Sequence, residues 1–321
     1  MSAPAALVGA GSQAVTVTPL TSRIEWERLF GAVAAPHFPQ SWSYGEAKRA
    51  EGWDVERLVF HSAGTSVALC QVLVKRVLGL PVAARINRGP LFIGTPAEDV
   101  RLPVYRALRA RWRFARRGLL FLAPAMPSAA ESTSLLRSAG FIERRSAGWG
   151  SALIDLTPPP EAIRASVSSK WRNHLNGSLK AGIELRVLGD PESFEWMIGK
   201  HAANMRLKGF VGPSPAFVRA LTQASPRDFS LFQGLIEGEP CSAILVARHG
   251  AQAETFISWT GEQGRRTNAH HFLLWHVLME TKRAGARALD LGGYTTSDKY
   301  GAYKKGMKGR EYRLAGEWLA L

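Results

Sequence analysis

The fold is indicated by residues 229–260, which read FSLFQGLIEGEPCSAILVARHGAQAETFISWT. This stretch contains three largely apolar runs of strand length: Phe229–Glu237, Cys241–Arg248 and Ala253–Thr260. Gly238 and Gly250 lie between the runs, and short glycine-containing loops between such runs are typical of β-hairpins. The stretch therefore predicts a three-stranded antiparallel meander.

Helices are predicted on both sides of the meander. Glu192–Lys208 and Ser214–Ala224 precede it, and a helix capped by Asn268 follows and ends before Gly285. A polar N-cap and a glycine after the last turn are common helix boundaries. A strand at Ala288–Leu291 comes next, so the order is helices, meander, helix, strand.

The first half of the chain shows the same order without a repeat at the level of residues. Its predicted helices are Ser22–Val33, Ser43–Glu51, Val100–Arg117 and Ser132–Ala139. Its predicted strands are Val55–His61, Ser66–Val77, Val82–Asn87, Leu119–Ala123, Phe141–Arg145 and Ser151–Leu156. We therefore expect an α/β protein with mixed sheets, in which the same fold occurs twice.

The boundary between the halves is predicted at Thr157-Pro-Pro-Pro-Glu161, because prolines suit the first turn of a helix. The expected domains are residues 1–156, of which 1–14 form a loose tail, and residues 157–321. An amphipathic helix should follow the prolines. Its apolar residues recur every four positions: Ile163, Val167, Trp171, Leu175 and Leu179.

Charge is the most informative part of the composition. The 321 residues include 41 Lys and Arg against 26 Asp and Glu, a net charge of +15. Such an excess attracts RNA, nucleotide-linked substrates, coenzyme A or an anionic membrane surface. No apolar run reaches membrane-spanning length, and the N-terminus lacks a basic start, so we expect a cytoplasmic protein. Cys70 and Cys241 match no metal spacing and are interpreted as inert thiols.

Four short motifs then carry a resemblance. They are Phe38-Pro-Gln-Ser-Trp42, Ser168–Gly182 (SSKWRNHLNGSLKAG), Asn204-Met-Arg-Leu-Lys-Gly-Phe210, and Leu289-Asp-Leu-Gly-Gly293 followed by Gly301-Ala-Tyr-Lys-Lys-Gly-Met307. In this order the motifs resemble those of the Fem-type aminoacyltransferases. The sequence departs from the family pattern at Met307, where phenylalanine is usual, and at Lys308, where glycine is usual.

The resemblance implies two fused acetyltransferase-like (GNAT-like) domains. Family members transfer an amino acid from its transfer RNA ester to an amine of a peptidoglycan precursor, and related proteins use other acyl donors. It also implies that Lys304, after Tyr303, contributes to the site.

The residues themselves are compatible with acyl transfer to an amine. Such a reaction needs oriented reactants and positive charge at the developing oxyanion, not a covalent nucleophile. Motifs for a serine triad, a zinc protease or a phosphate loop are absent from the sequence. Lys304 is the candidate positive charge, and Asp290 either accepts the amine proton or braces the glycines after it. No cofactor and no metal are expected, because the spacing of His271 and His276 does not suit a metal pair.

An anion-binding region is predicted around residues 261–268, which join a strand to a helix N-terminus. Arg265, Arg266 and Asn268 lie there, but the glycines that cradle coenzyme A in acetyltransferases are missing. Arg206 and Lys208 are candidate partners of the same ligand. Trp259 and Tyr303 are candidate substrate contacts.

Three functions remain open from sequence. The first is transfer of an aminoacyl group from aminoacyl-tRNA to a peptide or peptidoglycan-type amine, and the second is transfer from acyl-coenzyme A or an acyl carrier. The third is a nonenzymatic module that binds RNA or membrane. The arginine-rich segment 100–117, with Tyr105 and Trp112, would suit RNA backbone or acidic lipid, or would simply be a solvated face.

Overall fold

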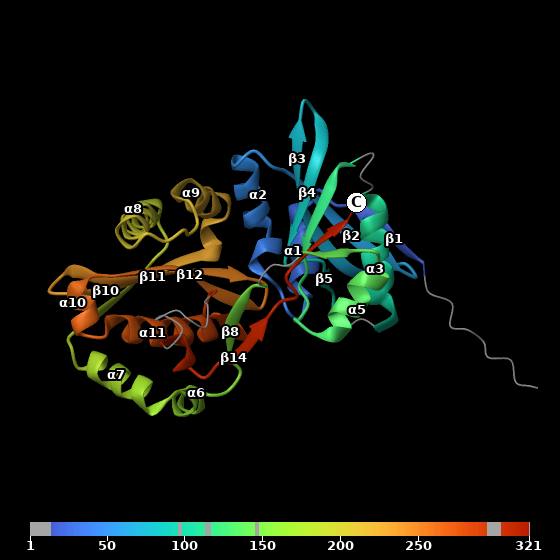
Figure 1. The fold of residues 1–321 in the computed structure, drawn as a ribbon. Helices are drawn as coiled ribbons and strands as arrows, with labels where there is room; N and C mark the ends of the chain where they lie inside the picture. Colours follow the sequence, from blue (N-terminus) through green and yellow to red (C-terminus); the bar gives the residue numbers. More distant parts are fainter. Residues whose placement is uncertain (1–13, 96–97, 113–116, 145–147, 294–302, 321) are drawn as a thin grey trace, which may run out of the picture.

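The computed structural model describes residues 14–95, 98–112, 117–144, 148–293 and 303–320. Figure 1 shows two sheets, each covered by helices of its own. The predicted α/β architecture with two similar halves is confirmed.

The first sheet has eight strands in the order β1-β2-β3-β4-β6-β15-β7, with β5 paired to β3. The bounds are β1 Val15–Pro19, β2 Asp54–Ser62, β3 Thr65–Val77, β4 Leu80–Asn87, β5 Leu91–Phe92, β6 Leu119–Ala123, β7 Ile142–Arg144 and β15 Glu317–Ala320. The helices of this half are α1 Arg23–Gly31, α2 Trp42–Ala50, α3 Glu98–Arg111 and α5 Ala130–Ser138, with a 3-10 turn, η1, at Phe38–Gln40. Tyr105, Trp112 and Trp318 are fully buried in the core of this half.

The second sheet has seven strands in the order β14-β8-β13-β12-β11-β10-β9. The bounds are β8 Gly150–Asp155, β9 Glu184–Leu188, β10 Phe229–Ile236, β11 Glu239–His249, β12 Gln252–Thr260, β13 Ala288–Asp290 and β14 Arg310–Arg313. The helices are α6 Pro160–Ser166, α7 Ser169–Leu179, α8 Pro191–Lys208, α9 Pro215–Ala224, α10 Glu262–Arg266 and α11 Ala269–Arg283, and η2 covers Pro226–Asp228. α7 and α11 pack on one face with Trp171 and Leu273 buried, and α8 and α9 pack on the other with Met197 and Leu221 buried.

The meander is confirmed, since β10, β11 and β12 pair in antiparallel order. Two strands pair across the predicted division of the chain, one of them a predicted strand and the other not predicted. β8 was expected in the first half but pairs with β13 and β14 of the second sheet, while β15 leaves the second half and pairs with β6 and β7 of the first. The two sheets therefore exchange a strand across the predicted division after residue 156.

Two local predictions are also corrected. The helix expected over residues 163–179 is two helices, because Val167 and Ser168 are extended and the Ser168 hydroxyl accepts a bond from the Trp171 amide to begin α7. Asn268 does precede α11, but it is left-handed (φ 55°) and its side chain makes no capping bond.

The two halves pack directly on each other. Phe38 of η1 lies 5.4 Å from the Phe256 ring and 6.2 Å from the Phe229 ring, and Tyr44 of α2 lies 5.3 Å from Phe217 of α9, all between ring centroids. These contacts hold the first half against the α8–α9 face of the second sheet, so side chains of both halves can meet at one site.

Candidate active site

The candidate active site lies where strands β12 and β13 part. Parallel pairing joins only Gln252–Glu254 to Ala288–Asp290. Beyond it, a register shift against β11 leaves Phe256 as a bulge, and bulges are common where pairing ends beside functional sites. Gly292 has φ 73°, and a Cβ atom there would lie 2.7 Å from the Thr255 carbonyl oxygen. The close approach of the segment after β13 to the Thr255 backbone of β12 therefore requires glycine at position 292.

Lys304 is fixed at this divergence. Its Nζ atom donates to the carbonyl oxygens of Gly292 at 2.9 Å and Gly293 at 3.1 Å. The side chain is half-buried, and its charge acts on Glu254 and His270. A positioned ammonium group in a partly desolvated site can stabilise an oxyanion.

Asp290 is buried beside Lys304 and its carboxylate is held by three donors. It accepts bonds from the Gly292 amide at 2.8 Å, from Tyr312 Oη at 2.5 Å and from Ser151 Oγ. These bonds match the bracing alternative of the two roles considered from sequence. The Asp290 carboxylate thus binds the Gly292 amide, while Lys304 binds the Gly292 and Gly293 carbonyl oxygens, so both side chains hold the same short segment.

Glu254 is a site residue that the sequence reasoning missed. It is in register with Asp290 on the neighbouring strand and is buried. Burial raises the pKa of its carboxyl to about 7, a shift that Asp290 reinforces and that Arg88 and Lys304 oppose. A carboxyl group that titrates near neutral pH is suited to general base catalysis. The available signal was an acidic residue within the otherwise uncharged strand Ala253–Thr260.

Arg88, which partners Glu254, comes from the first half. Its Nη1 atom lies 3.4 Å from Glu254 Oε2, and its guanidinium lies 3.9 Å from the ring centroid of Trp149. Burial, followed by the charge of Arg88, lowers the pKa of His37 to about 3, so this imidazole stays neutral. No local sequence pattern pairs positions 88 and 254, which are far apart in the chain.

The predicted anion-binding loop has a different structure from the one expected. Residues 262–266 form α10, in which Arg266 pairs with Glu262 and Arg265 donates to the Thr260 carbonyl at 2.9 Å. α10 packs closely on β11, because a Cβ atom at Gly264 would lie 2.2 Å from the Cys241 carbonyl oxygen. The amides of Arg265, Thr267 and Asn268 donate to carbonyl oxygens of the same loop.

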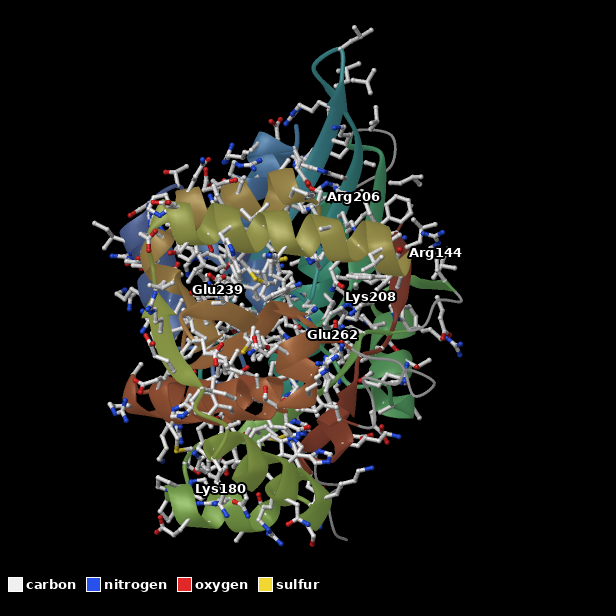
Figure 2. All side chains as sticks on the ribbon, turned by 90° about the vertical axis from the view of Figure 1, so that its left-hand side faces the viewer. Arg144, Lys180, Arg206, Lys208, Glu239 and Glu262 are labelled. Carbon is white, nitrogen blue, oxygen red and sulfur yellow. The ribbon has the colours of Figure 1, made fainter. Side chains whose placement is uncertain are left out.

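The remaining predicted contacts lie in three places. Arg206 and Lys208 are exposed at the end of α8, as Figure 2 shows. Trp259 packs edge-on against Trp196 at 5.6 Å, with Lys200 over its ring. Tyr303 packs among Trp171, His270 and His271 and donates to the His270 carbonyl, so it anchors the segment that carries Lys304.

The two departures from the Fem pattern fit the fold. Met307, where the family pattern has phenylalanine, is buried in the apolar core of the second half. Lys308 has φ 51°, a left-handed conformation that glycine adopts most easily.

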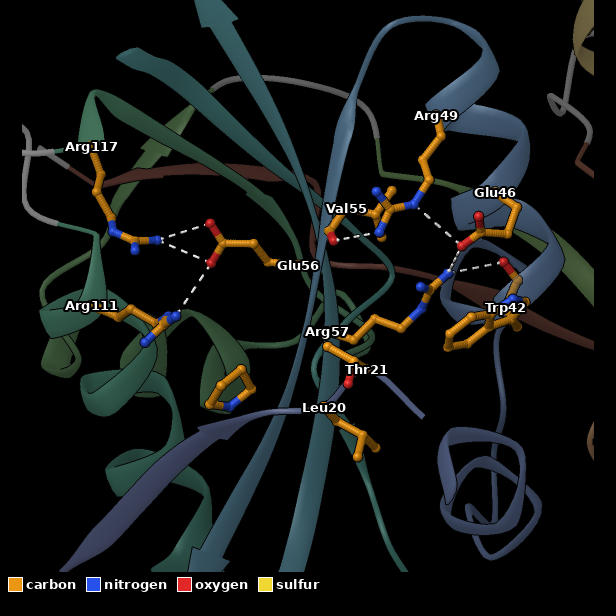
Figure 3. Close-up of a pocket in the computed structure, with 11 residues that line it drawn as sticks. Leu20, Thr21, Trp42, Glu46, Arg49, Val55, Glu56, Arg57, Arg111 and Arg117 are labelled. Carbon is orange, nitrogen blue, oxygen red and sulfur yellow. Dashed lines mark hydrogen bonds and ion pairs between the residues drawn. The ribbon is translucent and has the colours of Figure 1, made fainter. Parts of the chain in front are cut away.

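In the described part of the arginine-rich segment, Tyr105 of α3 and Trp112 after it are fully buried, so neither ring is available for base stacking. Residues 113–116 of the predicted helix lie outside the described residues. The end of α3 borders a pocket of about 420 Å³ in the first half, shown in Figure 3. There Arg111 and Arg117 bind Glu56, while Arg57 binds Glu46 and Gln71. Protein carboxylates therefore balance much of the positive charge in this pocket.

Within the described ranges, no three His, Cys, Asp or Glu side chains are grouped so as to hold a metal ion. None of the helices among them combines the length and the apolar character needed to cross a bilayer.

Known proteins are similar to this chain in sequence over part of its length and in fold over most of it. Residues 164–305 match the family model described as an acetyltransferase (GNAT) domain. The crystal structure of FemX superposes with a TM-score of 0.82 at 15% identity, covering 95% of this chain and 97% of FemX. The match confirms the predicted acyltransferase domain, and the superposition confirms the predicted fold.

Two other solved structures are similar over most of their length. A tandem GNAT protein of the clavulanic acid biosynthesis pathway has a TM-score of 0.54 at 15% identity, covering 95% of this chain and 98% of that protein. The C-terminal domain of a putative lysylphosphatidylglycerol synthetase from Agrobacterium fabrum has a TM-score of 0.55 at 12% identity. The superposition covers 93% of this chain and 92% of that domain. No curated protein matches the sequence.

Proposed function

We propose a reaction for this protein from its FemX-like fold and from the match of residues 164–305 to an acetyltransferase (GNAT) domain. The protein transfers an aminoacyl group from aminoacyl-tRNA to an amine of a peptide or peptidoglycan-type precursor, by direct aminolysis, in the cytoplasm. The observation that carries this proposal is the placement of Lys304 and Glu254 at the point where β12 and β13 part.

The proposed chemistry is balanced by groups of this chain. The neutral amine attacks the ester carbonyl, and a C–N bond forms while the C–O bond to the ribose breaks. Lys304 stabilises the negative oxygen, ionised Glu254 accepts the amine proton, and protonated Glu254 then passes that proton to the ribose oxygen, which leaves as a hydroxyl. Asp290 positions the Gly292 turn that Lys304 holds.

An aminoacyl-tRNA donor is favoured over acyl-coenzyme A by the structure of α10. Acetyltransferases bind a pyrophosphate with free amides at this helix start. In this chain residues 262–266 form a helix, and Thr267, Asn268 and His270 stand in place of the glycines that let a pyrophosphate approach those amides. The positive charge of the protein, +15 overall, suits a polynucleotide donor.

The experiment offers the purified protein two donors in parallel. One is a mixed pool of charged transfer RNAs and the other a panel of acyl-coenzyme A thioesters, each with an amine-bearing peptidoglycan precursor. The expected result is loss of aminoacyl ester above spontaneous hydrolysis, with formation of an amide, in wild type but not in Lys304→Ala. Consumption of thioester alone would establish the alternative donor. RNA binding that is unchanged in Lys304→Ala, with no turnover of either donor, would establish the nonenzymatic alternative.

A further inference from the structure

The hairpin of β3 and β4 projects beyond the first sheet (Figure 1). Pairing of β3 with β2 begins at Val74, and pairing of β4 with β6 begins at Ala83. Within the described sheet, residues 76–81 are therefore paired only with each other. This segment therefore extends beyond the edge of the first sheet.

The tip of the hairpin is apolar and exposed to solvent. Leu78 is 98% exposed and Leu80 is 69% exposed, and Val77 and Val82 are also exposed. Leu78 and Gly79 form the turn with φ values of 51° and 80°. Turns of this left-handed kind favour asparagine or aspartate before glycine, so leucine is unfavourable here both for solvation and for backbone conformation. A residue that is costly on both counts suggests a function for the tip.

Cations and an aromatic ring surround the base of the tip. Lys75 Nζ lies 5.5 Å from the ring centroid of Trp53 and donates to the Gly52 carbonyl at 3.0 Å. Arg76 donates to the Gly79 carbonyl at 3.1 Å. Arg76 also pairs with Asp54 at 2.5 Å, and the next cations along the chain, Arg85 and Arg88, pair with Glu317 and Glu254. The positive charge at the tip therefore comes from Lys75 and from the part of the Arg76 charge that Asp54 leaves unbalanced. The arrangement is an apolar tip above a basic and aromatic collar.

We propose that this hairpin docks the protein on an anionic phospholipid surface. Leu78 and Leu80 enter the boundary between headgroups and acyl chains, while Lys75, Arg76 and Trp53 lie at the level of the headgroups. Tryptophan and basic residues are enriched at that level, and acidic lipids attract clustered cations. A few buried apolar side chains with such a collar give reversible peripheral binding.

A second copy of the chain is a weaker fit for the same tip. A two-fold contact between hairpins would bring the same surface of both copies together. Lys75 and Arg76 would then lie close to their own equivalents, and like charges repel. A deformable anionic surface also accommodates a narrow convex tip, which a rigid partner could cover only with a matching groove.

The test is cosedimentation of the full chain with vesicles of phosphatidylglycerol and phosphatidylcholine, and with vesicles of phosphatidylcholine alone. Leu78→Asn suits the left-handed turn and so preserves the fold. We expect it to weaken partitioning into the mixed vesicles by about tenfold, and Leu80→Thr to have a similar effect. Ile24→Ser, at an exposed apolar residue of α1 that is 83% exposed, is the matched control and should bind as wild type does.

Each outcome decides the proposal. Binding to mixed vesicles that weakens in both hairpin variants and in high salt supports it. Equal binding by Leu78→Asn and wild type overturns it, as does equal binding to neutral and anionic vesicles. A dimer in sedimentation velocity that Leu78→Asn dissociates, without vesicle binding, would assign the tip to a second copy instead. Acyl transfer to a soluble acceptor is measured separately, so failure of docking leaves the proposed reaction unaffected.

Discussion

Replacing Glu254 with glutamine separates the energetic effect of this buried carboxyl from its proposed chemical role. Burial raises the pKa of Glu254 from 4.5 to about 7. A shift of this size corresponds to a preference of about 3 kcal/mol for the protonated form in the folded protein. Glutamine resembles the protonated form but cannot ionise, so the variant does not pay the free-energy cost of ionising this buried group as the pH rises.

The sign of the effect follows from proton binding. Between pH 4.5 and about 7 the folded protein holds a proton on Glu254 that the unfolded chain has released. Stability contributed by this group is therefore complete below pH 4.5 and is lost as the pH rises to about 7. Relative to wild type, Glu254→Gln should gain up to about 3 kcal/mol in free energy of unfolding across this window.

Urea unfolding of both proteins at pH 5, 6, 7 and 8 measures this difference directly. Groups that titrate equally in both proteins cancel when the two are subtracted. Glu262→Gln, at an exposed residue paired with Arg266, is the control and should show a flat difference. A difference between Glu254→Gln and wild type that is constant across the series would refute the reasoning.

The same variant tests catalysis independently. If ionised Glu254 accepts the amine proton, kcat/KM of wild type should rise with pH and level off above about 7. Glu254→Gln should lose this acid limb and about a hundredfold or more in turnover. An intact acid limb in the variant would exclude the proposed base, even if the stability difference is found.

Other side chains of the site give further tests. Lys304→Ala should lower kcat by about a hundredfold or more, whereas its exposed neighbour Lys305→Ala should turn over normally; equal loss in both would indicate a general disruption of the segment. Asp290→Asn should lower the melting temperature but keep the acid limb, because its carboxylate braces Gly292; loss of the limb would restore Asp290 as the base. Neutralising Arg265 and Arg266 together should weaken donor binding and reduce its dependence on salt, and unchanged affinity would remove both from the binding site.

Local features of the fold could be predicted because their signals lie within short windows. Gly238 has φ 81° and Gly250 has φ 56°, and both connect strands of the meander as the sequence indicates. Gly209 ends α8 in a left-handed conformation for the same reason. Glycines and apolar periodicity report on backbone shape near themselves, so these elements were found.

Pairing between distant strands was not predictable in this way. β8 is an apolar strand like those before it, and its residues carry no mark of the sheet in which they pair. Its place between β13 and β14 depends on where the second half folds back. The split of the helix after Thr157 was missed for a related reason, because the apolar spacing continues through Val167 although the backbone is extended there.

In the candidate site, too, residues with a short-range sequence signal could be predicted and residues defined by distant contacts could not. Lys304 and Asp290 were found because each lies beside glycines in a short motif. Glu254 was missed because its significance depends on burial and on Arg88, neither of which is visible within the meander. The structure therefore places Glu254 beside Asp290 and in the field of Lys304, and Glu254 rather than Asp290 becomes the proposed proton acceptor.

The geometry makes the first half part of the site, although the family match covers only residues 164–305. Arg88 lowers the pKa that burial raises in Glu254, and Trp149 covers both Arg88 and Gly293. Without this arginine the carboxyl would lose its nearest opposite charge, and its pKa would rise further above neutrality. Less of the ionised base would then be present at neutral pH. The second half alone holds the groups closest to the proposed reaction, but the first half adjusts the base to the pH at which it must act.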